Sequence, residues 1–313
     1  MTPKRIVYID TDIALGTPGA EIDDAAALML LLASPGIQIA GIGSVFGNTS
    51  VANVTANLAR FLNYFNRDDI PLGHGAENPL AGNLDWFKEW QSGYGQTPPY
   101  TGKLPEVSAC DLLIDTLHQF PNQLSILALG PMTNLAQALQ KSSQIIQLVR
   151  EVIAMGGSFD EHPSSPEFNI HCDPVAADRV IHAGWPVTLF GLNITRQASF
   201  TSRQFAALSS CHPALDLLKR QASFWIERVT AMGWDTNGCA LHDAVAAAYF
   251  LDDTLFKAMP AKVNVNTKPG KSWGTTQIQE NKAENNNIKV VKEVDAERCR
   301  DLIWSSISKI WEA

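Results

Sequence analysis

The sequence predicts an α/β protein whose 313 residues form a single domain, 1–313, around a mostly parallel central sheet flanked by helices. Three observations support this prediction. Short apolar runs of strand length recur along the chain, each is followed by a longer segment of helical character, and no stretch has the composition of a linker between domains. Strands that alternate with helices pair in parallel, and the helices then cover both faces of the sheet.

The first part of the chain contains two such strand–helix pairs. The apolar run IVYID at 6–10 predicts a strand, and the Ala/Leu-rich segment 25–34 predicts a helix. IQIAGIGSV at 37–45 predicts the next strand, and apolar residues recur at helical spacing over 51–65. Each pair therefore indicates one parallel strand with its covering helix.

The pattern continues to the C-terminus. Three more strands are expected from LSILAL, EVIAMG and VTLFGL, at 124–129, 151–156 and 187–192. Helices are expected after them, at 132–140, 174–183 and 202–209. The polar segment 267–287 predicts a hairpin excursion before the strand-like IKVVKEV, and 296–313 predicts a closing amphipathic helix.

Charge and composition exclude several function classes. The net charge of −8 argues against nucleic acid and anionic membranes as partners, because both select basic surfaces. Five scattered cysteines without a CxxC spacing indicate free thiols in a reducing compartment. The chain begins without a signal-peptide pattern, and its apolar runs fall short of the ~20 residues that span a bilayer. We therefore expect a cytoplasmic protein.

The opening stretch KRIVYIDTDIALGTPGAEIDD, residues 4–24, is unusually acidic. Asp10 and Asp12 end the first predicted strand, and Asp23 and Asp24 precede the first predicted helix. A helix N-terminus favours a carboxylate by only ~0.3–1 kcal/mol, which is too little to hold four together. An oxygen-ligated cation, Ca²⁺ or Mg²⁺, would do so. Two other readings remain open here: the Asp pair could be a helix cap, and the DxD could begin a metal-dependent phosphatase.

Later segments carry a family resemblance. GPMTN lies at 130–134, MGG at 155–157, PEFNIHCDPVAA at 166–177 and GCALHDAVAAAY at 238–249, and FGN at 46–48 follows the second strand. Together with the opening aspartates, these motifs resemble the nucleoside hydrolase family of the inosine-uridine N-ribohydrolase type, in order and over nearly the whole chain. The resemblance implies a Rossmann-related α/β fold and a small-molecule ribonucleoside as substrate.

The resemblance also implies site residues. One Ca²⁺ per subunit would be held by three side chains and one main-chain carbonyl, those of Asp12, Asp24, Asp243 and Leu129. Asp10 would lie behind these ligands and orient the site. Contacts to the sugar are implied for a further set, which comprises Asp23, Asn48, Met155, Glu167 and Asn169.

The implied reaction is hydrolysis of the N-glycosidic bond to free base and ribose. Asp12 would act as general base on a calcium-bound water, and His242 would donate a proton to the leaving base. Positive charge grows on the ribosyl group during this reaction, and the surrounding carboxylates stabilise it. Direct attack by water predicts inversion at the anomeric carbon. The family also suggests a homo-oligomer, a dimer or a tetramer.

The sequence departs from the family pattern at three places. After MGG, the segment SFDEHPSSPEFN shows no evident asparagine for the 5′-hydroxyl of the sugar. Ten residues, 13–22, separate Asp12 from the Asp pair where the pattern has three. The segment 85–100 takes the place of a loop that often carries a histidine, and here it carries aromatic residues instead. Trp86, Trp90 and Tyr94 could stack on a base. Trp234 is the preferred candidate for this contact, while His74 could approach the site and His171 is expected to pack in the interior.

Two alternative functions remain at this point. A DxD-type phosphohydrolase would leave FGN, EFN and the His-Asp pair without a role. A non-catalytic nucleoside or sugar binder would have no need for both a base and an acid. Nucleoside hydrolysis is the reading that uses all of these residues.

Overall fold

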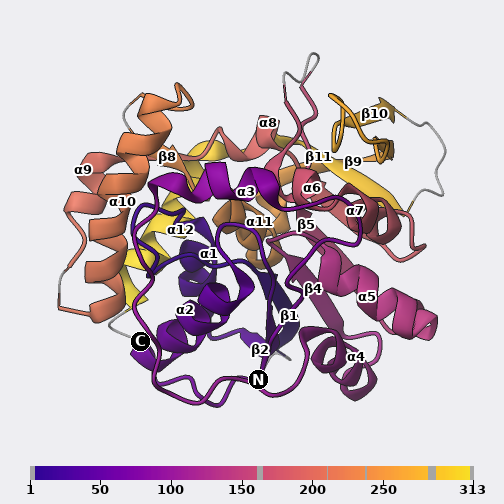
Figure 1. Cartoon of the computed structure of the whole chain (residues 1–313), viewed down its shortest axis with the longest axis horizontal. Coiled ribbons are helices and arrows are strands. Elements are labelled where there is room, and N and C mark those ends of the chain that lie inside the picture. The colour runs from indigo at the N-terminus through magenta and orange to yellow at the C-terminus, as the bar shows by residue number, and fades with distance from the viewer. Residues whose placement is uncertain (1–3, 161–164, 210, 237, 281–286, 311–313) are drawn as a thin grey trace.

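The computed structural model describes residues 4–160, 165–209, 211–236, 238–280 and 287–310. A nine-stranded sheet has the order β10-β9-β11-β6-β5-β4-β1-β2-β3 (Figure 1). Its strands are β1 (Arg5–Thr11), β2 (Ile37–Ser44), β3 (Leu72–Gly73), β4 (Leu124–Ala128), β5 (Glu151–Met155), β6 (Val187–Phe190), β9 (Phe256–Val265), β10 (Thr276–Glu280) and β11 (Ile288–Val294). Pairing is parallel from β3 through β6 to β11, and β9 runs antiparallel to both β10 and β11. The mostly parallel sheet is therefore confirmed.

Helices cover both faces of this sheet, as the sequence predicts. They are α1 (Asp23–Leu32), α2 (Val51–Tyr64), α3 (Asp85–Trp90), α4 (Ala109–Gln119), α5 (Thr133–Lys141), α6 (Phe168–Cys172), α7 (Pro174–Ile181), α8 (Leu192–Thr195), α9 (Ser202–Ala206), α10 (Pro213–Ala231), α11 (His242–Leu251) and α12 (Ala296–Lys309). Three 3₁₀ turns, η1 (Gln91–Gly93), η2 (Ser143–Gln147) and η3 (Asp253–Leu255), and a small antiparallel pair, β7 (Ser199–Thr201) with β8 (Gly238–Ala240), complete the fold.

Alternation along β1 shows how the two faces are filled. Val7 and Ile9 join a core that includes α1, α10, α11 and α12, whereas Tyr8 between them joins a core that includes α4, α5 and α7. Successive side chains of a strand point to opposite faces, so one apolar run supplies both layers. Figure 1 shows α4 and α5 on one side of the strands and α1 and α2 on the other.

The predicted elements largely agree with the structure, and the differences have clear causes. The segment 202–209 is helical only over α9, and the predicted helix 296–313 begins with α12, although its last three residues lie outside the described part. The predicted hairpin is formed by β9 and β10, with 281–286 outside the described residues. Helices α4 and α10 were not predicted, because neither directly follows a strand of the strand–helix alternation.

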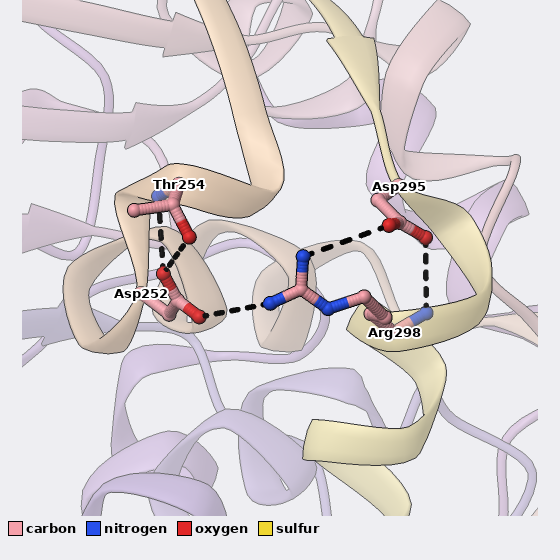
Figure 2. Close-up of polar contacts among 4 residues, drawn as sticks. All are labelled: Asp252, Thr254, Asp295 and Arg298. Carbon is pink, nitrogen blue, oxygen red and sulfur yellow. Dashed lines mark hydrogen bonds and ion pairs between the residues drawn. The ribbon is translucent and has the colours of Figure 1, made fainter.

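A charged joint connects the end of α11 to the start of α12. Arg298 lies 3.8 Å from both Asp252 and Asp295, and Asp295 also caps α12 by accepting a hydrogen bond from the Arg298 main-chain N–H (Figure 2). Arg298 is 61% exposed, and exposed pairs contribute only ~0–1 kcal/mol. These ion pairs therefore contribute little to the stability of the fold, and the defined role of Asp295 is the cap of α12. Within the described residues, no helix is both long and apolar enough to cross a membrane.

Candidate active site

A cavity of about 420 Å³ opens at the carboxyl edge of the parallel strands. Asp12 follows β1, Asn48 follows β2, Leu129 follows β4 and Met155 ends β5, and all four residues line the cavity. Parallel sheets bind ligands at this edge. Ten of the twelve predicted site residues line it together: Asp12, Asp23, Asn48, Leu129, Met155, Glu167, Asn169, Trp234, His242 and Asp243. The other two, Asp10 and Asp24, are buried behind this lining.

Two helices present the acidic residues. Asp23 and Asp24 begin α1, and Asp243 is the second residue of α11, which packs against α1. One carboxylate oxygen from each of these three aspartates lies within 4.8 Å of the others. The capping position of α1 is Ile22, so the Asp pair is not the N-cap of this helix. The cap interpretation is therefore wrong, and the three carboxylates form a group that could hold a metal ion.

Hydrogen bonds fix the acidic side chains. Asp12 Oδ2 accepts a bond from the main-chain N–H of Asn48 at 2.7 Å. The Asn48 amide donates to Asp24 at 3.3 Å, and the Thr11 hydroxyl also donates to Asp24. Asp10 accepts a bond of 2.8 Å from the Asn134 side chain. This network orients the carboxylates but adds no positive charge.

The acidic cluster is electrostatically unbalanced. Burial raises the pKa of Asp23 to about 8 and that of Asp24 to about 6, and it raises the pKa of Asp12 and Asp243 well above the usual range. The charges of neighbouring aspartates contribute to this upward shift of the pKa for Asp12, Asp23 and Asp243. The buried Oδ1 of Asn48, within the described residues, has no hydrogen-bond partner. Oxygen donors with an unpartnered amide oxygen among them fit a hard divalent cation.

Glu167 and Asn169 also line the cavity, and hydrogen bonds to the main chain hold both side chains. Glu167 caps α6 and accepts main-chain bonds from Gly157 (3.2 Å), Asn169 (2.8 Å) and Ile170 (2.9 Å). Burial raises the pKa of Glu167 to about 7. The Asn169 amide donates to the carbonyl of Leu129 at 2.6 Å. Because a carbonyl oxygen has two lone pairs, that of Leu129 can accept this bond and still face a cation.

His242 opens α11 beside the acidic cluster. Its Nδ1 lies 2.7 Å from the Thr195 hydroxyl, so Nε2 is the ring nitrogen available to the cavity. Burial, together with the charge of Arg196, lowers the pKa of His242 to about 4. This low pKa favours the neutral imidazole, so proton donation by His242 requires that the bound substrate raises the pKa of the ring.

Aromatic residues form a second group in the cavity lining, which we call the aromatic wall. Trp86, Trp90, Phe168, Trp225 and Trp234 all line the cavity. Trp90 and Trp234 are stacked, with ring centroids 5.7 Å apart and an interplanar angle of 23°. We call the carboxylate-lined part of the cavity its polar half and the part lined by these rings its aromatic, apolar half.

Three aromatic or histidine positions differ from expectation. Tyr94 packs behind Trp90 and is not part of the cavity lining, whereas Trp86 and Trp90 both reach it. His171 lines the cavity instead of packing in the interior, with its ring 4.9 Å from that of Trp86. His74 is exposed and pairs with Ser108 in a β-bridge away from the cavity.

Sequence reasoning missed several lining residues. Glu21 and Arg196 reach the cavity from segments to which no site role was assigned, Cys239 comes from the motif that carries the His-Asp pair, and Trp225 reaches it although Trp234 was the preferred candidate for the base contact. Glu21 is the most informative, because it belongs to the unexplained residues 13–22 and sits two residues before Asp23. Its acidic side chain was visible in the sequence, but the path of the extra loop was not.

Fold and site together define the class: this is an α/β protein with buried carboxylates and aromatic rings in one cavity at the carboxyl edge of its sheet. Residues 7–301 match the family model described as inosine-uridine preferring nucleoside hydrolase. The chain therefore belongs to this family of nucleoside hydrolases, which are enzymes that hydrolyse N-glycosyl compounds.

Relatives and solved structures agree with the family. The chain is 32% identical over 273 residues to uridine nucleosidase 1 of Arabidopsis thaliana, covering 84% of this chain and 78% of that protein. It is 36% identical over 211 residues to probable uridine nucleosidase 2 of Oryza sativa subsp. japonica; this match covers 64% of this chain and only 60% of the rice protein's length. The solved structure of a purine-preferring ribonucleoside hydrolase from Gardnerella vaginalis superposes with a TM-score of 0.85 at 25% identity, covering 97% and 98% of the two chains.

Proposed function

We propose that this enzyme hydrolyses the N-glycosidic bond of ribonucleosides to ribose and a free base, with Asp12 as general base and His242 as the donor to the leaving base. The observation that carries the proposal is the division of one cavity between buried carboxylates and an aromatic wall. A ribose has hydroxyl groups for the polar half, and a nucleobase has a flat ring for the apolar half.

We propose Ca²⁺, one per chain, as the cofactor. Asp12, Asp24, Asp243 and the Leu129 carbonyl would hold it, with Asp10 orienting the site from behind. The oxygen-only donor set and the close approach of Asp24 to Asp243 support this assignment. When bound, the cation supplies charge balance for the carboxylates and lowers the pKa of water beside them. Asp23 belongs to the same cluster, and we assign its remaining hydrogen-bonding capacity to the ribose hydroxyls.

Asp12 is placed to receive a proton. The Asn48 N–H bond at 2.7 Å holds one carboxylate oxygen in position, and the side chain lines the cavity. A carboxylate there takes the proton of the attacking water as the bond to the anomeric carbon forms. The bond to the base breaks at the same carbon, and its electron pair leaves with the base nitrogen. Glu167 and Asp23 lie around the sugar and favour the positive charge that develops on it.

We assign two contacts to the leaving base, a hydrogen bond from His242 and stacking on the aromatic wall. Thr195 fixes Nδ1 of His242 and so directs Nε2 to the cavity, where it can hydrogen-bond the base nitrogen. Trp234, stacked on Trp90, offers a flat surface to the base. We assign the remaining polar contacts with the sugar to Asn48 and Asn169, and Met155 packs beside it.

We also propose that the enzyme assembles as a dimer or a tetramer. The support for this proposal is the family to which the chain belongs. Sedimentation analysis tests this: a monomer at micromolar concentration would refute it.

Release of free ribose from a panel of nucleosides, with and without a chelator, tests the function. The panel should contain uridine, cytidine, inosine and adenosine, because the named relatives include both uridine and purine enzymes. We expect ribose release that stops with the chelator and returns with Ca²⁺. Ribose release from none of them would refute the proposal. Phosphate release from nucleotides alone would favour the DxD phosphohydrolase, and tight nucleoside binding without turnover would favour a binding protein.

A further inference from the structure

The extra loop between Asp12 and Asp23, residues 13–22, is a fixed part of the structure; we call it the insert. Most of it is buried, and the side-chain amide of Gln221 on α10 holds it. This amide accepts a hydrogen bond from Gly16 N at 2.9 Å and donates to the carbonyls of Ala14 at 3.0 Å and Ala20 at 3.1 Å. Both ends of the amide are therefore used to fix the insert against α10.

The insert in turn holds the segment that carries Trp90. We call residues 85–97 the wall segment. Gly95 N donates to the carbonyl of Pro18 at 2.8 Å. The hydroxyl groups of Thr17 and Thr97 are hydrogen-bonded at 2.7 Å. The wall segment is thus attached to the insert by one main-chain bond and one side-chain bond.

Arg228 on α10 also contacts the wall segment. Its guanidinium donates to the main-chain carbonyl of Trp90. It also lies over two rings, 5.2 Å from the centroid of Trp90 and 4.9 Å from that of Tyr94. A planar guanidinium can hydrogen-bond and stack at once, which a lysine ammonium cannot do as well.

One face of α10 brings these contacts together. Gln221, Trp225 and Arg228 are spaced four and three residues apart, so they lie along one side of the helix. The first clamps the insert, the second lines the cavity, and the third binds the wall segment. Trp90, which stacks on Trp234, is therefore held by α10 in two ways: directly through Arg228, and indirectly through Gln221 and the insert.

We propose that Arg228 is a positioning residue for base recognition, which together with the insert keeps Trp90 in place as a preformed stacking surface. This inference rests on the proposed function, because it takes the nucleobase as the occupant of the aromatic half. Arg228 is not among the residues that line the cavity, so it acts through Trp90. Its loss should weaken substrate binding and leave the carboxylate chemistry unchanged.

Kinetics of Arg228→Met and Arg220→Met, with Ca²⁺ present, test the proposal. Arg220 lies on the same helix, is 65% exposed and pairs with Asp216 at 3.0 Å, so it is a matched control. We expect R228M to raise KM for uridine and inosine roughly 5- to 30-fold, with kcat within about twofold of the original. R220M should match the original protein. R228K keeps the positive charge but loses the planar guanidinium, so its KM should lie between those of R228M and the original protein.

Circular dichroism supplies a readout that does not depend on activity. Two stacked indoles give a coupled signal, which R228M should lose and R220M should keep, with helix content unchanged in both. Thr97→Val removes the bond to Thr17 with little change in shape and leaves the Asn57–Thr17 bond in place, so it should raise KM in the same direction by a smaller factor.

The outcomes separate this inference from the proposed function. An unchanged KM and an unchanged indole signal in R228M would overturn it, as would a fall in kcat with KM constant. If the unmodified protein releases no ribose from any nucleoside, the proposed function fails. The indole signal alone then decides whether Arg228 positions Trp90: its loss in R228M supports that role, and its persistence refutes it.

Discussion

Replacing Gly47 by alanine should displace Asp12 without adding or removing a polar group. A Cβ atom built on Gly47 would lie 1.9 Å from Oδ2 of Asp12, where real contacts are at least 3.0 Å. The carboxylate must therefore shift by about 1 Å, and a shift of this size in a reacting group can lower the rate on the order of 100-fold. The same shift lengthens the bond from Asn48 N that holds the carboxylate.

Two further glycines give a graded series. A Cβ atom on Gly130 would lie 2.9 Å from Oδ1 of Asp12 and 2.7 Å from a methyl carbon of Val45, so a displacement of only a few tenths of an ångström relieves it. A Cβ atom on Gly36 would meet nothing within 4 Å. None of the three has the left-handed backbone that disfavours alanine. The predicted order of kcat is therefore G36A, then G130A, then G47A as the slowest.

The assay is ribose release at saturating nucleoside, with thermal unfolding to show that each variant is folded. We expect G36A to match the original protein and G47A to lose about two orders of magnitude in kcat. A folded G47A variant with a kcat within threefold of the original would refute the assignment of Asp12 as general base. An equal loss in G36A would show that the effect comes from the backbone.

Three other predictions concern the same site. Asp12→Asn should lower kcat by roughly 10²- to 10⁴-fold with the fold intact by circular dichroism, and near-normal turnover would contradict the base role. His242→Ala should slow inosine hydrolysis more than that of an activated aryl riboside, which needs no proton on its leaving group; equal losses would exclude proton donation. In a chelator, the melting temperature should fall as pH rises from 5 to 8. Burial raises the pKa of Asp24 to about 6 and that of Asp23 to about 8, above the ordinary value of 3.8, so the folded state is favoured while these groups are protonated and loses that stability as pH rises through those values. Ca²⁺ should flatten this dependence, and a melting temperature independent of pH in the chelator would refute the reasoning.

The sequence places Asp12 at the end of a parallel strand by its pattern alone, whereas Asn48, Leu129 and Met155 are named from the family resemblance, and the roles of all four stay predictions. Asp12, Asn48, Leu129 and Met155 each lie at the carboxyl end of a parallel strand, and such ends converge at one edge of a sheet. Once the strands are located in the sequence, the residues that follow their carboxyl ends are located as well. The same reasoning places Asp23 and Asp243 at the starts of helices on that edge.

The aromatic half could not be predicted in this way, because it depends on how loops fold onto helices. His171 reaches the cavity because α6 is short and its ring packs on Trp86, while Nδ1 lies 3.1 Å from the carbonyl of Trp273 in the distant β9–β10 connection. Trp225 lies on α10, whose apolar residues recur at helical spacing but which follows no strand of the main sheet. These contacts are made between segments far apart in the chain, and no local pattern specifies them.

The attachment of the insert to Gln221 has an evolutionary consequence. The Gln221 side chain is buried, and its amide is hydrogen-bonded to the insert backbone. If the insert were shortened, this amide would be left buried without partners, at a cost of about 1–3 kcal/mol. Loop length and the residue at this position of α10 should therefore vary together among family members. Chains with the short three-residue loop should carry an apolar residue where this one has glutamine, and a frequent glutamine there would show that the two features evolve independently.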